Sequence, residues 1–196
     1  MKRLLIVGDS FAAPYENQPA WTNLINAKVD NRAQAGVGQY KILQQLKNYH
    51  QDHDGVLVVL TSEMRVYIKN NPFYGSEHRH ANADLIFADI ESRRGDPWAD
   101  RLLWWFGNVF DLEHARAIND LILAEIYRLL ELRQKPWKVV TFFDPYPEQF
   151  DFDGRLENLN QIWKDHPGTI NHLNTTGHDI MAANINAWLD NDLNTP

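Results

Sequence analysis

The chain has 196 residues, a formal net charge of −7 and no cysteine. This length is typical of one folded domain, and the charge argues against nucleic acid as a partner because no basic cluster is present to follow a phosphate backbone. The missing cysteine excludes disulfides and thiolate chemistry, and no apolar run approaches the roughly 20 residues of a membrane helix, so we expect a cytoplasmic protein without membrane contact.

Short apolar runs predict strands that are buried on both faces of a sheet. The four predicted strands are residues 3–7, 27–31, 56–60 and 138–143. Segments with apolar residues at steps of three and four predict helices between and after them. The four predicted helices are residues 21–26, 40–49, 112–132 and 176–190. This alternation predicts an α/β fold with a mostly parallel sheet that is covered on both sides.

Residues 66–110 interrupt the alternation and contain a cluster of aromatic residues that includes Trp98, Trp104 and Trp105. We interpret them as an insertion in a single domain of residues 1–196, close to the carboxyl edge of the sheet. Core packing is the first interpretation of the cluster. A lid, a platform for sugars or a subunit interface are alternatives, so a homo-oligomer is left open.

The candidate chemistry begins where the first strand ends, at Gly8-Asp9-Ser10. Sites in open parallel sheets form at the carboxyl ends of the strands. A serine becomes a nucleophile when a histidine takes its proton, and that histidine is usually oriented by a carboxylate. His172, in a loop before the last predicted helix, could reach this edge, whereas we expect a structural role for His178.

Three blocks of the chain resemble the GDSL-type, or SGNH, hydrolases. They are Gly8-Asp9-Ser10, "NRAQAGVGQY" with Gly36, and "HLNTTGH" with His172. The resemblance implies a flavodoxin-like three-layer α/β/α sandwich and a serine esterase or acylhydrolase that needs no cofactor or metal. It also implies Ser10 as nucleophile, His172 as general base, and the N–H groups of Ser10 and Gly36 as an oxyanion hole. The substrate would be an ester of a small molecule or a carbohydrate.

Two positions depart from the pattern of that family. Thr61-Ser62-Glu63-Met64 stands where the family has Gly-x-Asn-Asp, so Ser62 becomes the candidate third oxyanion donor, with Thr61 and Arg65 as substitutes. We also expect Asp9, Thr61 and Arg65 to contact the substrate.

The aspartate that precedes the catalytic histidine in the family is Thr169 here, so Asp165 is the first candidate for the orienting acid and Asp144 the second. These departures support an alternative, a non-catalytic binding or structural protein with the same fold. A weaker alternative is a flavodoxin-like module that binds a phosphorylated ligand.

For the other polar residues we predict roles outside catalysis. His50 to Asp54 should form a solvated loop at the opposite edge of the sheet. Arg79 between His78 and His80 would repel a cation, so we expect no metal there. Arg65 could bind a carboxylate or a phosphate, and a surface salt bridge is an equal alternative.

Overall fold

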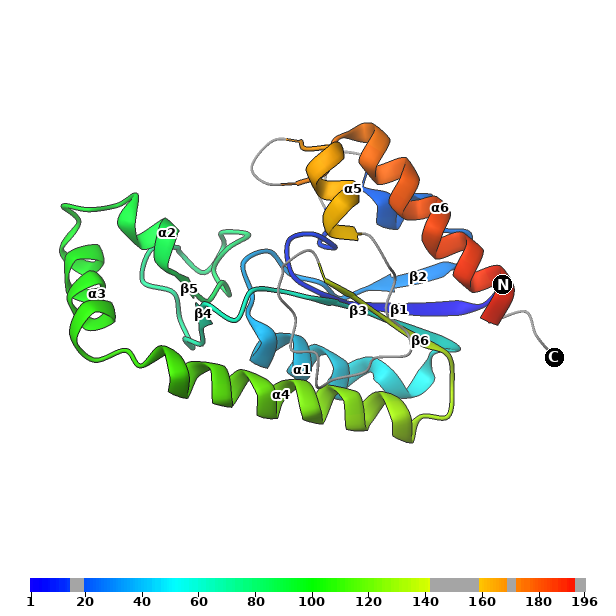
Figure 1. Ribbon diagram of the computed structural model, residues 1–196, viewed down its shortest axis with the longest axis horizontal. Coiled ribbons are helices and arrows are strands. Elements are labelled where there is room, and N and C mark those ends of the chain that lie inside the picture. The colour runs from blue at the N-terminus through cyan, green and yellow to red at the C-terminus, as the bar shows by residue number, and fades with distance from the viewer. Residues whose placement is uncertain (15–19, 142–158, 169–171, 193–196) are drawn as a thin grey trace.

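A parallel four-stranded sheet is the centre of the computed structural model, which describes residues 1–14, 20–141, 159–168 and 172–192 (Figure 1). Its strands are β1 (Arg3–Gly8), β2 (Lys28–Asn31), β3 (Gly55–Leu60) and β6 (Trp137–Thr141). They lie in the order β2-β1-β3-β6, and each neighbouring pair is parallel. The predicted α/β class with a mostly parallel sheet is therefore confirmed.

The two central strands are buried on both faces, which explains their continuous apolar sequence. Along β1, Leu4 and Ile6 enter one hydrophobic core, whereas Leu5 and Val7 enter the core on the opposite face. The residues of β3 divide between the same two cores, and all six of them are buried.

Helices cover both faces of the sheet (Figure 1). On one face lie α1 (Gln39–Tyr49) and α4 (Leu112–Leu132). On the other lie the 3-10 helix η1 (Trp21–Leu24), α5 (Leu159–Asp165) and α6 (Thr175–Asp192). In the described part of the chain, no helix combines the length and apolar character that crossing a bilayer requires.

The helix predicted over residues 21–26 is wrong in type and length. It is a 3-10 helix of four residues, and Ile25 after it is extended. The side chain of Asn186 explains the extended exit, because its Oδ1 accepts from Asn26 N (2.8 Å) and its Nδ2 donates to Leu24 O (3.1 Å). A tertiary contact therefore overrides the local helical pattern.

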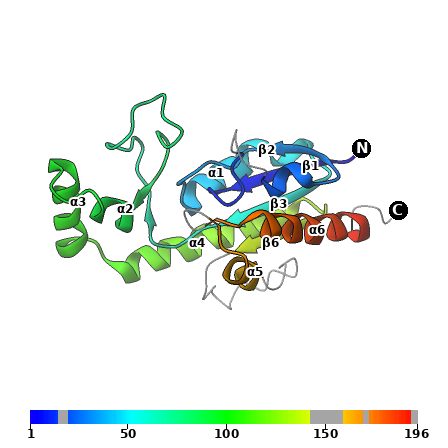
Figure 2. The same cartoon turned by 90° about the horizontal axis from the view of Figure 1, so that it is seen from above.

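The segment after β3 projects beyond the carboxyl ends of the strands (Figures 1 and 2). It contains the antiparallel pair β4 (Arg65–Val66) and β5 (Leu85–Ile86), followed by α2 (Phe87–Glu91) and α3 (Pro97–Asn108). The core-packing interpretation of its aromatic cluster is wrong for two members. Trp98 and Trp104 are 54% and 62% exposed, because they lie on faces of α3 that no other described element covers.

The expected solvated loop at the opposite edge of the sheet is also wrong for His53. Its side chain is buried, its Nε2 lies 3.0 Å from Asp30 Oδ2, and its carbonyl accepts from Arg133 and Lys135. These contacts join the end of α4 to the start of β3.

The connections that leave β1 and β3 diverge. The chain after β1 passes to η1 on the face of α6, whereas the chain after β3 leads through the projecting segment to α4 on the face of α1. Two adjacent strands whose connections leave on opposite faces open a crevice at their carboxyl ends, where ligands of open α/β sheets bind. Ser10 and Ser62 follow these two strands.

Candidate functional site

The turn that carries Ser10 depends on Gly8 and Asp9. A Cβ on Gly8 would lie 2.7 Å from Val59 Cβ, so glycine allows β1 to approach β3 closely. Asp9 is fully buried; its Oδ1 accepts from Phe11 N (3.0 Å), and its carbonyl accepts from Ala12 N and Ala13 N. This tight turn leaves Ser10 half-buried at the end of the strand.

Gly36 occupies a position that only glycine tolerates. Its φ is +79°, and a Cβ there would lie 2.6 Å from Ala83 Cβ in the projecting segment. Its carbonyl accepts from Asp84 N at 3.0 Å. Within the described ranges, neither Gly36 N–H nor Ser10 N–H donates to an acceptor.

Two backbone hydrogen bonds fix the position of His172 and of the residues after it. Gly168 N donates to His172 O (2.6 Å), and Asn174 N donates to His166 O (2.9 Å). The next residue, Leu173, is buried in the core that α6 shares with β1. Asn174 Oδ1 accepts from Gly177 N (3.0 Å) in the first turn of α6, an N-cap interaction that sets where the helix begins.

The structure brings the turn of Ser10 and the turn of His172 together. The rings of Phe11 and His172 are 5.2 Å apart between centroids. Trp21 holds the same turn to the last helix, because its Nε1 donates to Phe11 O (2.8 Å) and its N donates to His178 Nδ1 (3.2 Å). The bond from Trp21 N gives His178 the structural role that the sequence predicts.

Burial sets the protonation of the two histidines. It lowers the pKa of His172, and the nearby Asp9 carboxylate partly opposes that change. Burial also lowers the pKa of His178, and the neighbouring His172 adds to the effect. A neutral His172 at neutral pH has a lone pair that can accept a proton.

Arg65 is neither exposed nor free of a partner. Its side chain is 10% exposed; Nη2 lies 3.0 Å from Asp9 Oδ2, and Nη1 donates to Val37 O (2.8 Å). The alternative of a surface salt bridge is therefore wrong, because the ion pair is buried. Arg65 joins the turn after β1 to the loop before α1.

The residues after β3 offer hydroxyl groups in place of an asparagine. Ser62 Oγ accepts from Met64 N (3.2 Å), which leaves its proton available for another acceptor. Thr61 is buried, and its Oγ1 has no hydrogen-bond partner within the described chain.

The candidates for the acid that orients His172 are Asp165 and Asp144. Asp165 is exposed at the end of α5, where its Oδ1 accepts from Gln161 Nε2 (2.8 Å). Asp144 and Thr169 lie outside the described residues.

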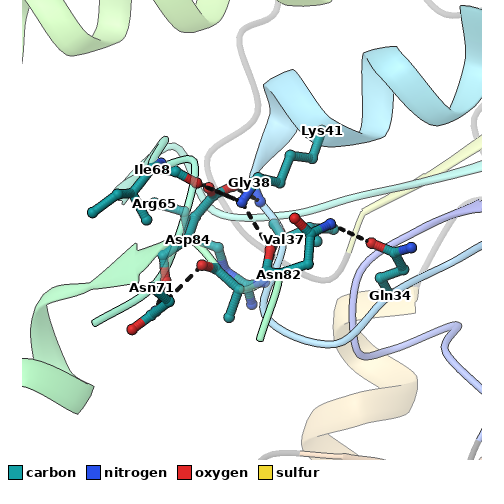
Figure 3. Close-up of polar contacts among 10 residues, drawn as sticks. Gln34, Val37, Gly38, Lys41, Arg65, Ile68, Asn71, Asn82 and Asp84 are labelled. Atoms are coloured by element: carbon teal, nitrogen blue, oxygen red, sulfur yellow. Dashed lines mark hydrogen bonds and ion pairs between the residues drawn. The ribbon is translucent and has the colours of Figure 1, made fainter. Parts of the chain in front are cut away.

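Sequence reasoning missed a buried ion pair at the start of α1, beside Gly38 (Figure 3). Asp84 Oδ1 lies 2.7 Å from Lys41 Nζ and also accepts from Ile68 N (3.0 Å). Asp84 Oδ2 accepts from Gly38 N (2.6 Å). Lys41 Nζ also donates to the carbonyls of Ile68 and Asn82. A lysine in the first turn of a helix usually lies in solvent, so no local pattern could reveal this pair.

His80 is a second histidine near the Gly36 loop that the sequence did not single out for this site. Its Nδ1 lies 3.6 Å from where a Cβ of Gly36 would be, and its Nε2 accepts from Arg79 Nε (3.0 Å). Burial lowers its pKa, as do the charges of Arg79 and His78. The neutral ring thus carries its proton on Nδ1.

Across residues 1–14, 20–141, 159–168 and 172–192, no three histidine, aspartate or glutamate side chains gather as a metal site would require. No protein-family model matches the chain, and no curated protein matches it either.

Proposed function

We propose that the chain is a serine-dependent hydrolase of esters, with a flavodoxin-like α/β/α fold of the SGNH type. The observation that carries the proposal is the contact between the rings of Phe11 and His172, because it brings a half-buried histidine with a lowered pKa to the residue next to Ser10. The N–H groups of Ser10 and Gly36, which donate to no acceptor in the described chain, support it independently.

The proposed reaction follows from these groups. His172 takes the proton of Ser10 Oγ, which attacks the carbonyl carbon of the ester and forms a tetrahedral intermediate. The N–H groups of Ser10 and Gly36, with the hydroxyl of Ser62, donate to its oxyanion. His172 then protonates the leaving alcohol, and a water molecule releases the acyl group by the same steps. Asp165 is the proposed orienting acid.

The charges favour an uncharged ester of a small molecule or carbohydrate. Arg65, which lies beside the turn of Ser10, is neutralised by Asp9. A phosphorylated ligand would need a cation or a free helix N-terminus, and Gly38 N at the start of α1 already donates to Asp84. The alternative of a module for phosphorylated ligands is therefore disfavoured.

The test is hydrolysis of p-nitrophenyl acetate, together with labelling by a fluorophosphonate probe. We expect Ser10→Ala to abolish labelling and reduce hydrolysis to the uncatalysed rate, and Ser62→Ala to reduce the rate by about 10²-fold. Ser76→Ala, at an exposed serine of the projecting segment, is the matched control and should retain both signals. Hydrolysis by Ser10→Ala at the parent rate would reject the proposal.

One observation favours a second candidate, a binding protein without turnover. Asp165 is exposed and is engaged by Gln161, and the asparagine donor is replaced by Ser62. Loss of an orienting acid reduces the rate about 10⁴-fold in the serine proteases. A folded parent protein that neither reacts with the fluorophosphonate probe nor hydrolyses the ester would support this candidate.

A further inference from the structure

We infer that a cavity between α1, β4 and α4 binds an uncharged aromatic molecule that carries an amide group. The cavity has a volume of about 460 Å³ and is lined by the first turn of α1, by Glu63 to Tyr67, and by residues from the end of α3 to the middle of α4. This inference goes beyond the proposed hydrolase and does not depend on it.

The walls of the cavity are suited to a flat ring. Tyr40 and Tyr67 meet edge to face with 4.8 Å between their centroids, and Trp105 lies 5.5 Å from Phe110. Ile118 and other aliphatic residues of α4 complete the lining. Aromatic ligands gain most from such walls, through offset and edge-to-face contacts.

Polar side chains also line the cavity, and that of Asn119 on α4 stands out because no hydrogen bond joins it to any described residue. Asn119 is only 7% exposed as a whole, but its amide is not among the fully enclosed polar atoms without a partner, so its polar atoms can be reached from the cavity. A carboxamide that is held in the wall and can still be reached offers its hydrogen bonds to a ligand. A carboxamide has one acceptor and two donors, which match the donor and acceptor of another amide.

The charges of the lining disfavour an anion. Glu63 and Arg65 after β3, and Asp84 before β5, are already in the ion pairs Glu63–Arg116, Arg65–Asp9 and Asp84–Lys41. Asp111 caps α4 by accepting from Glu113 N and His114 N. An anion would lose its hydration here without meeting an unpaired arginine or lysine of the lining.

The cavity is distinct from the turn of Ser10. Ser10, Gly36 and His172 are not among the described residues that line it. Arg65 lies between the two places, since it lines the cavity while its guanidinium contacts Asp9. Binding can therefore be measured without any reference to hydrolysis.

The test uses isothermal titration of the whole chain with 2-naphthamide and with 2-naphthoate, which has the same rings and a negative charge. We expect the amide to bind and the carboxylate to bind at least about ten-fold more weakly, because a buried charge without a partner is unfavourable. Equal binding of the two probes, or no binding of the amide, would overturn the inference.

Asn119→Leu separates a ligand-binding amide from a structural one. It should weaken binding of 2-naphthamide about ten-fold, because the group that pairs with the amide of the probe is removed, and should leave Tm close to that of the parent. The matched control is Asn186→Leu on α6, whose amide accepts from Asn26 N and donates to Leu24 O. It should lower Tm and leave the affinity unchanged. Unchanged affinity in Asn119→Leu would contradict the inference.

A second variant keeps the test decisive if Asn119→Leu fails to fold. Ile118 lines the cavity and is 43% exposed, so Ile118→Trp can fill the space without burying a new group in the core. We expect it to fold as the parent does and to lose binding of 2-naphthamide. Retained binding would place the probe elsewhere and overturn the inference.

Discussion

Two buried carboxylates lie on either side of the loop that contains Gly36, and they are satisfied to different degrees. Asp84 has a lysine and two backbone N–H groups as partners. Asp9 has one backbone N–H on Oδ1, while its Oδ2 faces Arg65 at 3.0 Å without hydrogen-bond geometry.

The difference separates a structural role from an electrostatic one. The bonds of Asp84 come from α1 and from the projecting segment, so they fix that segment to the helix. Asp9 has fewer bonds, and its charge acts on His172, whose pKa it raises against the effect of burial. A buried carboxylate whose oxygens all have hydrogen-bond partners stabilises the fold. A buried carboxylate with fewer partners shifts the pKa of a neighbouring group through its charge.

The largest expected effect is that of Asp84→Asn, which leaves the buried Lys41 without a counter-charge. We expect it to lower the free energy of unfolding by about 3–5 kcal/mol, measured by urea denaturation. The double variant Lys41→Met with Asp84→Leu removes both charges and should lose much less than the two single changes together. Additive losses would show that the pair does not act as a unit.

Gly36→Ala should come next, because it combines a positive φ with a clash against Ala83. We expect a loss of about 2–4 kcal/mol in the same urea measurement. Adding Ala83→Gly should recover the part due to the clash and leave the part due to φ. The control is Gly75→Ala, where a Cβ would meet nothing within 4 Å and stability should stay unchanged.

Asp9→Asn should have a smaller effect on stability and a specific effect on His172. We expect a loss of about 1–3 kcal/mol, because one ion pair without hydrogen-bond geometry is removed. The pKa of His172 should fall further, since the carboxylate that raises it is gone. An NMR titration of the histidine rings measures this change. An unchanged His172, or an equal change at His178, would contradict the role given to Asp9.

The smallest expected effect is a dependence of stability on pH. The pKa values of His172 and His178 are lowered by burial, so near pH 6 the unfolded chain binds more protons than the folded one. Stability should therefore be complete above the ordinary histidine pKa of about 6.5 and decline as pH falls below it. Urea midpoints at about pH 7.5 and about pH 5.5 measure this decline, and His178→Asn should reduce it.

The sequence predicts correctly the strands and helices whose pattern lies within one short stretch of the chain. The run Leu4 to Val7 predicts β1 because both faces of the sheet are covered. The helix over residues 112–132 is confirmed with the same bounds, since its apolar period is regular and Asp111 caps it. The approach of His172 to the turn of Ser10 was also expected, although the catalytic roles of the two residues stay predictions.

The remaining features depend on contacts between distant segments. Lys41 is buried because Asp84 meets it from the projecting segment, which no helical pattern in α1 encodes. The exposure of Trp98 and Trp104 follows from where α3 lies, not from its composition. The role of Asp165 as the orienting acid of His172 stays a prediction, because Thr169 stands where the resemblance to the SGNH hydrolases would place an aspartate.

The two bonds of Trp21 also bear on biosynthesis. One reaches Phe11 and the other reaches His178, which is 157 residues away along the chain. Contacts of such long range form late, since the intervening chain must be ordered first. On the ribosome, the turn after the first strand stays without its histidine neighbours until the last helix has emerged. The candidate site is therefore assembled only after α6 has left the ribosome.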